Sequence, residues 1–149
     1  RVTAVDVSEF AVECARENAA RNGLSQVVDC MAANVFDLQP QLQKGQYDFI
    51  ILDPPAFTKS RQTTQRAMTG YKEINYRAMR LLPRGGYLAT CSCSHFATEE
   101  LFRKMLHAAA HDAGVQLRQI EARQQSADHP ILWGVEETSY LKFYLFQVV

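Results

Sequence analysis

The chain lacks any long hydrophobic run, and no stretch of about 18 consecutive apolar residues occurs in its 149 residues. A transmembrane helix is therefore not expected. Net charge is also absent, because 16 Lys and Arg balance 16 Asp and Glu, so no overall field draws the chain toward nucleic acid or a membrane surface. The opening residues, RVTAVDVSEF, carry Asp6 and Glu9 and do not resemble a signal peptide.

Cysteine is scarce, and a starting methionine is missing. The four cysteines do not form the pattern of a secreted disulfide framework. We therefore expect a cytoplasmic protein with reduced thiols and no membrane association. Because the chain begins inside an apolar stretch without Met, we also expect it to be the later part of a longer protein.

The remaining composition is that of a globular domain with a core, at 47% hydrophobic and 21% charged residues. Apolar, β-branched runs alternate with segments of helical periodicity. Strands are expected at residues 2–8, 27–32, 47–52, 87–93, 115–122 and 139–149, and helices at 9–23, 71–82 and 99–114. This alternation indicates an α/β fold with a mostly parallel sheet, whose nearly continuous apolar runs are typical of strands covered on both faces.

Polar and thiol side chains follow four of the expected strands. In parallel sheets, ligands bind beyond the carboxyl ends of the strands. The residues at these ends are Asp6, Asn34, Asp53 and the pair Cys91 and Cys93. We expect the four strand ends to share one edge and to form a site.

Asp6 and Asn34 each allow two interpretations. An acid at the end of a first strand is suited to accept hydrogen bonds from both hydroxyls of a ribose, or it is an acid favoured at a helix N-terminus. Asn34 lies where an amide could meet an adenine edge, or it is a turn residue.

The segment DPPAF, from Asp53 to Phe57, directly follows the apolar run FIIL. Two prolines hold the chain rigidly here, so a carbonyl and a carboxylate could together read the edge of a flipped base. Phe57 could stack on that base. The simpler interpretation is a turn that ends a strand.

The spacing of Cys91 and Cys93 fits neither a metal site nor a redox motif, because neither C-x-x-C nor further ligands at matching spacing occur. No metal is expected. Cys91 is well suited to be a small buried residue, whereas Cys93, nearer the edge of the sheet, is the better candidate for a nucleophile. His95 is interpreted mainly as a residue at the rim.

Four segments together resemble a known family: VDVSEFAVECARENAARNG, YDFIILDPPAF, GYKEINYRAMRLLPRGGYLATCSCS and ADHP…YLK. They resemble class I S-adenosylmethionine-dependent methyltransferases, and more closely the RlmI type, which are bacterial large-subunit rRNA (cytosine-carbon-5) methyltransferases. The resemblance covers essentially the whole chain. It implies a Rossmann-like sheet, mostly parallel with an antiparallel terminal strand, and a partial methyltransferase domain over residues 1–149.

The resemblance also implies the site residues. Cys93, seven residues after Gly86, resembles the nucleophile of this family, and Asp53 with Pro54 resembles the motif that holds the target cytosine. Asn34 departs from the family, which often has Asp at this place. The cofactor would be S-adenosylmethionine, held by Asp6, Val7, Asn34, Val35 and Asp53. The substrate, 23S rRNA, would meet Pro54, Pro55, Phe57, His129 and Tyr140, although the last two also suit plain packing.

The chemistry explains why a thiolate is needed. Carbon 5 of cytosine is a poor nucleophile until a thiolate adds to carbon 6, and protonation of ring nitrogen 3, assisted by Asp53, eases that addition. A base must then remove the proton from carbon 5. Related enzymes place a second Cys near the DPP segment, but Pro55 or Ala56 stands there, so the releasing base is unassigned.

Class I methyltransferases also need a Gly-rich loop after a first strand, and no G-x-G motif occurs here. The resemblance implies that this strand and loop are missing and that the strand belongs between the Asp6 and Asp53 strands. Family members further carry an upstream PUA-like RNA-binding domain. We therefore expect this chain alone to be inactive.

Two other functions stay open. The DPPAF segment resembles the DPPY of enzymes that methylate an exocyclic base nitrogen, where no thiol is needed. A non-catalytic scaffold that binds RNA or dimerises is the third reading. The target nucleotide and the formation of a homodimer are left undecided by the sequence.

Overall fold

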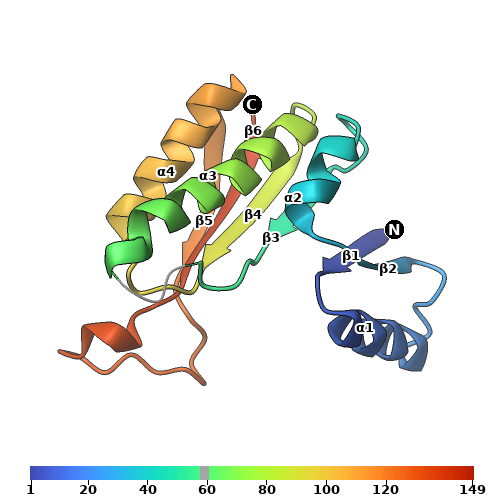
Figure 1. Cartoon of the computed structure of the whole chain (residues 1–149), viewed down its shortest axis with the longest axis horizontal. Helices are drawn as coiled ribbons and strands as arrows, with labels where there is room; N and C mark the ends of the chain where they lie inside the picture. The colour runs from blue at the N-terminus through green and yellow to red at the C-terminus, as the bar shows by residue number, and fades with distance from the viewer. Residues whose placement is uncertain (58–60) are drawn as a thin grey trace. The chain divides into compact units, whose positions relative to one another are not determined.

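The computed structural model describes residues 1–57 and 61–149, which divide into two compact units, Arg1–Leu42 and Gln43–Val149 (Figure 1). Each unit has its own sheet. Within the described ranges, every helix is too short or too polar to cross a membrane.

The first unit consists of a parallel two-stranded sheet and its connecting helix. Strands β1 (Val2–Asp6) and β2 (Val28–Ala32) pair with Asp6 opposite Ala32. Helix α1 (Glu9–Arg21) begins at Ser8, whose hydroxyl accepts a hydrogen bond of 3.2 Å from the backbone N–H of Ala11. The helix ends before Gly23, whose φ of +70° is the left-handed conformation typical of a glycine that follows a helix. A short helix, α2 (Val35–Leu38), and a 3-10 turn, Gln39–Gln41, follow β2.

The second unit is a four-stranded sheet in the order β3-β4-β6-β5. Its elements are β3 (Phe49–Leu52), a 3-10 turn (Arg61–Thr63), α3 (Thr64–Leu81), β4 (Tyr87–Ser92), α4 (Glu99–Ala113), β5 (Leu117–Arg123), a 3-10 turn (Glu136–Thr138) and β6 (Lys142–Val148). Strands β3 and β4 are parallel, and β6 is antiparallel to both β4 and β5. The predicted α/β fold with an antiparallel terminal strand is confirmed.

Helices α3 and α4 lie side by side over one face of this sheet (Figure 1). A chain of aromatic rings joins the layers: Tyr71 of α3 lies 5.8 Å from Phe102 of α4, which lies 6.2 Å from Tyr144 of β6. Tyr71 and Phe102 are fully buried and Tyr144 nearly so. The core of the second unit therefore forms where the two helices meet β4 and β6.

Two predicted loops are wrong in part. Residues 60–70 were expected to be a polar connection, of which Ser60 lies outside the described residues, yet α3 already begins at Thr64. The reason is that Ala67, at 4% exposure, continues the buried face of Tyr71 by one turn. The predicted loop after the second strand contains α2, because Asn34 caps a helical turn there.

The expectation of strands covered on both faces is also wrong for β1 and β3. Val2 is 56% exposed in β1, and Ile51 is 67% exposed in β3. In the part of the chain that the structure describes, β1 pairs only with β2 and β3 only with β4, so each strand lies at the edge of its sheet. A further strand beside β1 and β3 stays a prediction.

The core predicts a sharp contrast between two leucines of the second unit. Leu106→Ala in α4, at 3% exposure, is expected to lower the free energy of unfolding by about 2–5 kcal/mol, because it leaves a cavity. Leu132→Ala, at 59% exposure, is the matched control and should change it by less than about 0.5 kcal/mol. Urea denaturation followed by circular dichroism measures both, and equal losses would contradict this account of the core.

Candidate active site

The carboxyl ends of β3 and β4 bring the two predicted catalytic residues to one edge of the sheet. The parallel register pairs Leu52 with Thr90, so Asp53 and Cys91 are the next residues along the two strands. Strand β4 ends at Ser92, and Cys93 lies just beyond it. Asp53 is exposed and Cys93 is half-buried. A carboxylate and an accessible thiol are thus available at this edge.

Cys91 differs from Cys93 because it lies in the core, at 8% exposure. Burial raises the pKa of the Cys91 thiol to about 11, and the nearby negative charges of Asp53 and Cys93 add to the effect. At neutral pH Cys91 is therefore a protonated thiol, which is a poor nucleophile.

In residues 1–57 and 61–149, no three His, Cys, Asp or Glu side chains gather as the ligands of a metal ion would.

Tyr71 joins β4 to the DPPAF segment. Its hydroxyl accepts a hydrogen bond of 3.1 Å from the Ser92 hydroxyl, and its ring packs against Phe57 with centroids 4.6 Å apart. Burial raises the pKa of Tyr71, while hydrogen bonds from Ser92 and from the Phe57 backbone lower it. The sequence predicted Tyr71 only as the first residue of a helix, over residues 71–82. Its buried hydroxyl, which needs a partner, was the signal of a further role.

Lys142 was missed as well. It lies opposite Ser92 in the β4–β6 ladder and is 8% exposed. Its ammonium donates hydrogen bonds to the backbone oxygens of Ser94, at 2.5 Å, and Tyr140, at 2.8 Å. Burial lowers the pKa of Lys142 to about 8, and the charges of Cys93 and Glu99 oppose that shift. A lysine at the start of an apolar terminal strand was the available signal.

The remaining residues predicted on the substrate side are spread over two loops. Pro54 and Phe57 are half-buried and Pro55 is exposed, so Phe57 has one face on Tyr71 and part of its ring in solvent. Tyr140 is half-buried, and its backbone oxygen is a partner of Lys142.

His95 and His129 are both exposed. His95 contacts Phe96, with ring centroids 3.8 Å apart, as a residue at the rim would. His129 Nδ1 lies 3.3 Å from Asp128. The pKa of Asp128 is lowered, chiefly by the Ser126 hydroxyl and then by His129. In the described part of the chain, neither histidine forms a hydrogen bond or an ion pair with Cys93.

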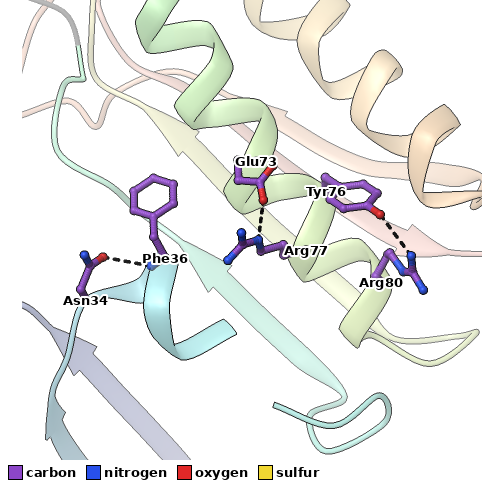
Figure 2. Close-up of polar contacts among 6 residues, drawn as sticks. All are labelled: Asn34, Phe36, Glu73, Tyr76, Arg77 and Arg80. Atoms are coloured by element: carbon purple, nitrogen blue, oxygen red, sulfur yellow. Dashed lines mark hydrogen bonds and ion pairs between the residues drawn. The ribbon is translucent and has the colours of Figure 1, made fainter. Parts of the chain in front are cut away.

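In the first unit, Asp6 and Asn34 lie at the carboxyl edge of the β1–β2 sheet. One Asp6 carboxylate oxygen accepts a hydrogen bond of 2.7 Å from the backbone N–H of Ser8. The Asn34 side-chain oxygen caps α2 by accepting a 3.0 Å hydrogen bond from the backbone N–H of Phe36 (Figure 2). The interpretation of Asn34 as a turn residue therefore holds for its oxygen, and its NH₂ group is what is left to meet a ligand.

These groups suit a nucleoside. Asp6 is exposed, so its second carboxylate oxygen can accept from ribose hydroxyls, and the Asn34 NH₂ can donate to a ring nitrogen of adenine. Val7 is 76% exposed and offers an apolar surface, while Val35 is half-buried. Each unit thus brings its own residues together, and a shared edge for Asp6, Asn34, Asp53 and Cys93 stays a prediction.

Two arginines of α3 have partners within the helix. The Arg77 guanidinium lies 2.5 Å from the Glu73 carboxylate, and Arg80 donates a 3.1 Å hydrogen bond to the Tyr76 hydroxyl (Figure 2). An ion pair between residues four apart stabilises a helix modestly. These arginines therefore do not by themselves make α3 a strongly basic surface.

Comparison with known proteins gives a consistent family. The family model for the methyltransferase small domain matches residues 1–116. Ribosomal RNA large subunit methyltransferase I of Klebsiella pneumoniae (strain 342) is 39% identical over 152 residues, and that of Pseudoalteromonas atlantica is 39% identical over 151. The matches cover 100% and 99% of this chain, which spans 38% of the length of each relative.

Solved structures share the fold at low sequence identity. SMU.776, a candidate methyltransferase complexed with SAH, superposes with a TM-score of 0.81 at 20% identity, over 98% of this chain and 38% of its own. The N-methyltransferase NodS of Bradyrhizobium japonicum WM9, also complexed with SAH, has a TM-score of 0.64 at 16% identity, over 99% and 66%. This likeness establishes the architecture of the sheet and helices.

The two cysteines are expected to differ in reactivity. At neutral pH, iodoacetamide should modify Cys93 much faster than Cys91, because a pKa of about 11 in place of 9.0 lowers the thiolate fraction about 100-fold. Peptide mass spectrometry of the full-length protein measures both rates. In guanidinium chloride the difference should vanish, and comparable rates in the folded protein would overturn the assignment of Cys91 to the core.

Proposed function

The chain belongs to the methyltransferase small-domain family, and we propose that it is part of an S-adenosylmethionine-dependent enzyme that forms 5-methylcytosine in 23S rRNA. The observation that carries this proposal is the half-buried Cys93 at the carboxyl edge of β4, near Asp53 and beside a second cysteine kept as a thiol. The names of the relatives support large-subunit rRNA as the substrate. Such a substrate implies the cytoplasm, and the proposal does not require a homodimer.

Five residues are assigned to the cofactor. Asp6 would bind the ribose hydroxyls, Asn34 and Val35 the adenine, with Val7 against its face, and Asp53 would lie toward the methyl-bearing end. The donor set supports this assignment, because an exposed carboxylate and an amide NH₂ match the hydroxyls and ring nitrogens of adenosine. When bound, S-adenosylmethionine supplies an electrophilic methyl group.

The first chemical task falls to Cys93. Its thiolate forms a bond to carbon 6 of the cytosine, which turns carbon 5 into an enamine-like nucleophile. Asp53 shares a proton with ring nitrogen 3, so that the negative charge developing on the base is neutralised as the bond forms. Pro54 and Pro55 hold the Asp53 carboxylate and the neighbouring carbonyls rigidly beside the base.

The last task is to remove the carbon 5 proton and expel the thiol. Cys91 is unsuited to it, because a buried thiol with a pKa of about 11 is protonated at neutral pH. The releasing base therefore stays unassigned. Phe57, His129 and Tyr140 complete the proposed substrate side, with Phe57 offering the exposed part of its ring to the base.

A covalent trap tests the nucleophile. The full-length protein is incubated with S-adenosylmethionine and RNA that contains 5-fluorocytidine, whose fluorine blocks release. We expect a stable adduct on Cys93, mapped by peptide mass spectrometry and absent from Cys93→Ala. Cys91→Ala is the matched control and should keep the adduct.

Other outcomes would each point elsewhere. An adduct on Cys91 would reverse the two roles. If RNA is methylated without any adduct, the thiol mechanism is wrong, and methylation of an exocyclic nitrogen through the DPPAF segment takes its place. A full-length protein that binds no S-adenosylmethionine would favour a non-catalytic scaffold.

The ribose assignment has its own test. Asp6→Asn removes the charge but keeps an oxygen for the N–H of Ser8. We expect S-adenosylhomocysteine to bind the full-length variant about 10–100-fold more weakly, because hydrogen bonds to a charged group contribute about 1.5–3 kcal/mol. Asp37→Asn, at an exposed position of α2, is the control. Unchanged affinity by isothermal titration calorimetry in Asp6→Asn would exclude Asp6 from the ribose site.

A further inference from the structure

Lys142 is a buried cation in a strand that is otherwise suited to apolar residues. In the described residues it is the one Lys or Arg that belongs to the buried set, with Tyr144, Phe146 and Val148 buried on the same face of β6. Burying an ammonium group is costly unless partners compensate it. A methionine would fill this place at a lower cost, so the retained charge calls for an explanation.

The partners seen for Lys142 account for only part of its requirements. An ammonium group has three donors, and the backbone oxygens of Ser94 and Tyr140 take two of them. Both partners are neutral. Glu99 also acts on Lys142, but its carboxylate accepts from the Tyr144 hydroxyl at 2.9 Å and lies 3.9 Å from Arg103. The positive charge of Lys142 is thus incompletely compensated within the folded chain.

The hydrogen bonds of Lys142 place its charge beside the segment that carries Cys93. Lys142 lies opposite Ser92 in the ladder, and its ammonium binds the carbonyl of Ser94, so its two fixed points flank Cys93 on either side. The two hydrogen bonds also hold together the segment after β4 and the segment before β6.

From this arrangement we propose that Lys142 is a positioning residue for Cys93: it fixes the segment that carries the thiol and stabilises the negative charge of its thiolate. The proposal rests on the proposed function, because it concerns the same nucleophile. A thiolate is the attacking species, so a neighbouring cation would increase the fraction that can react. The attraction is mutual, since the charge of Cys93 raises the pKa of Lys142 against the effect of burial.

Other charged groups near Lys142 influence its protonation state. A cleft of about 710 Å³ opens beside it. The titratable and charged residues that line the cleft with Lys142 are His95, Glu99, Arg123, Glu136, Glu137 and Tyr144. The acids among them would favour the charged form of Lys142, so that the ammonium is available to Cys93 at neutral pH.

The test measures how fast iodoacetamide modifies Cys93 in the full-length protein as a function of pH, without RNA or cofactor. Lys142→Met removes the charge and the donors, whereas Lys142→Gln keeps a donor without charge. Both are expected to slow the modification of Cys93 about tenfold at neutral pH and to move its pH profile upward. Lys142→Arg should keep the wild-type rate of Cys93 modification at neutral pH. Lys104→Met, at an exposed position of α4, should leave that rate unchanged.

The pH profile separates charge from plain packing. Wild-type rates in a folded Lys142→Gln variant would overturn the proposal, because a neutral donor would then suffice. Circular dichroism establishes folding of each variant. If neither neutral variant folds, Lys142→Arg provides the test, because an arginine keeps its charge above pH 8, where Lys142 loses it. Identical pH profiles of Cys93 alkylation in wild type and Lys142→Arg above pH 8 would refute the proposal.

The result is independent of the fluorocytidine trap. Failure of the trap together with slow alkylation in Lys142→Met would remove the proposed reaction but leave the stabilised thiolate. A normal adduct on Cys93 together with wild-type alkylation in Lys142→Met would leave the reaction and remove the role of Lys142.

Discussion

Strand β6 runs antiparallel between β4 and β5, and the arrangement of the candidate site depends on that placement. Because β6 begins opposite the last residue of β4, Lys142 enters the core beside the segment that carries Cys93. The same strand contributes Tyr144 to the aromatic chain that joins the sheet to α4. One strand therefore both completes the core of the second unit and supplies a buried cation whose ammonium binds the backbone of Ser94, next to Cys93.

Burial gives different reactivity to two cysteines that are separated by a single residue. Cys91 is a buried residue within the β4 ladder, so its thiolate is disfavoured, whereas Cys93 follows the end of the strand and is half-buried. Tyr71 fixes that boundary, since its hydroxyl is bound to Ser92 between the two cysteines and its ring supports Phe57. The end of a single strand thus gives neighbouring thiols opposite chemical properties.

Local signals predicted much of the fold because they act within a few residues. Ser8 and Thr98 cap α1 and α4 through their own hydroxyls, and Gly114 ends α4 with φ +68°. The start of α3 escaped prediction, since only contact with the rest of the core makes Ala67 part of a buried face. The exposure of β1 and β3 was not predicted for a similar reason, because an apolar run does not reveal how many neighbouring strands a strand has.

The sequence by itself determined the order of strands and helices, and it placed Asp6, Asn34, Asp53 and Cys93 at or just beyond strand ends. These features follow from hydrophobic periodicity and from capping and breaking residues, which are local. The expected burial of Cys91 is confirmed, whereas only the tertiary structure decided that Tyr71 holds the end of β4 and that Lys142 binds the Ser94 backbone. Lys142 and Ser94 are 48 residues apart in sequence, and no local pattern encodes a hydrogen bond across that distance. Such contacts form only once the sheet has assembled, because a buried charge or hydroxyl is costly unless nearby groups form hydrogen bonds with it.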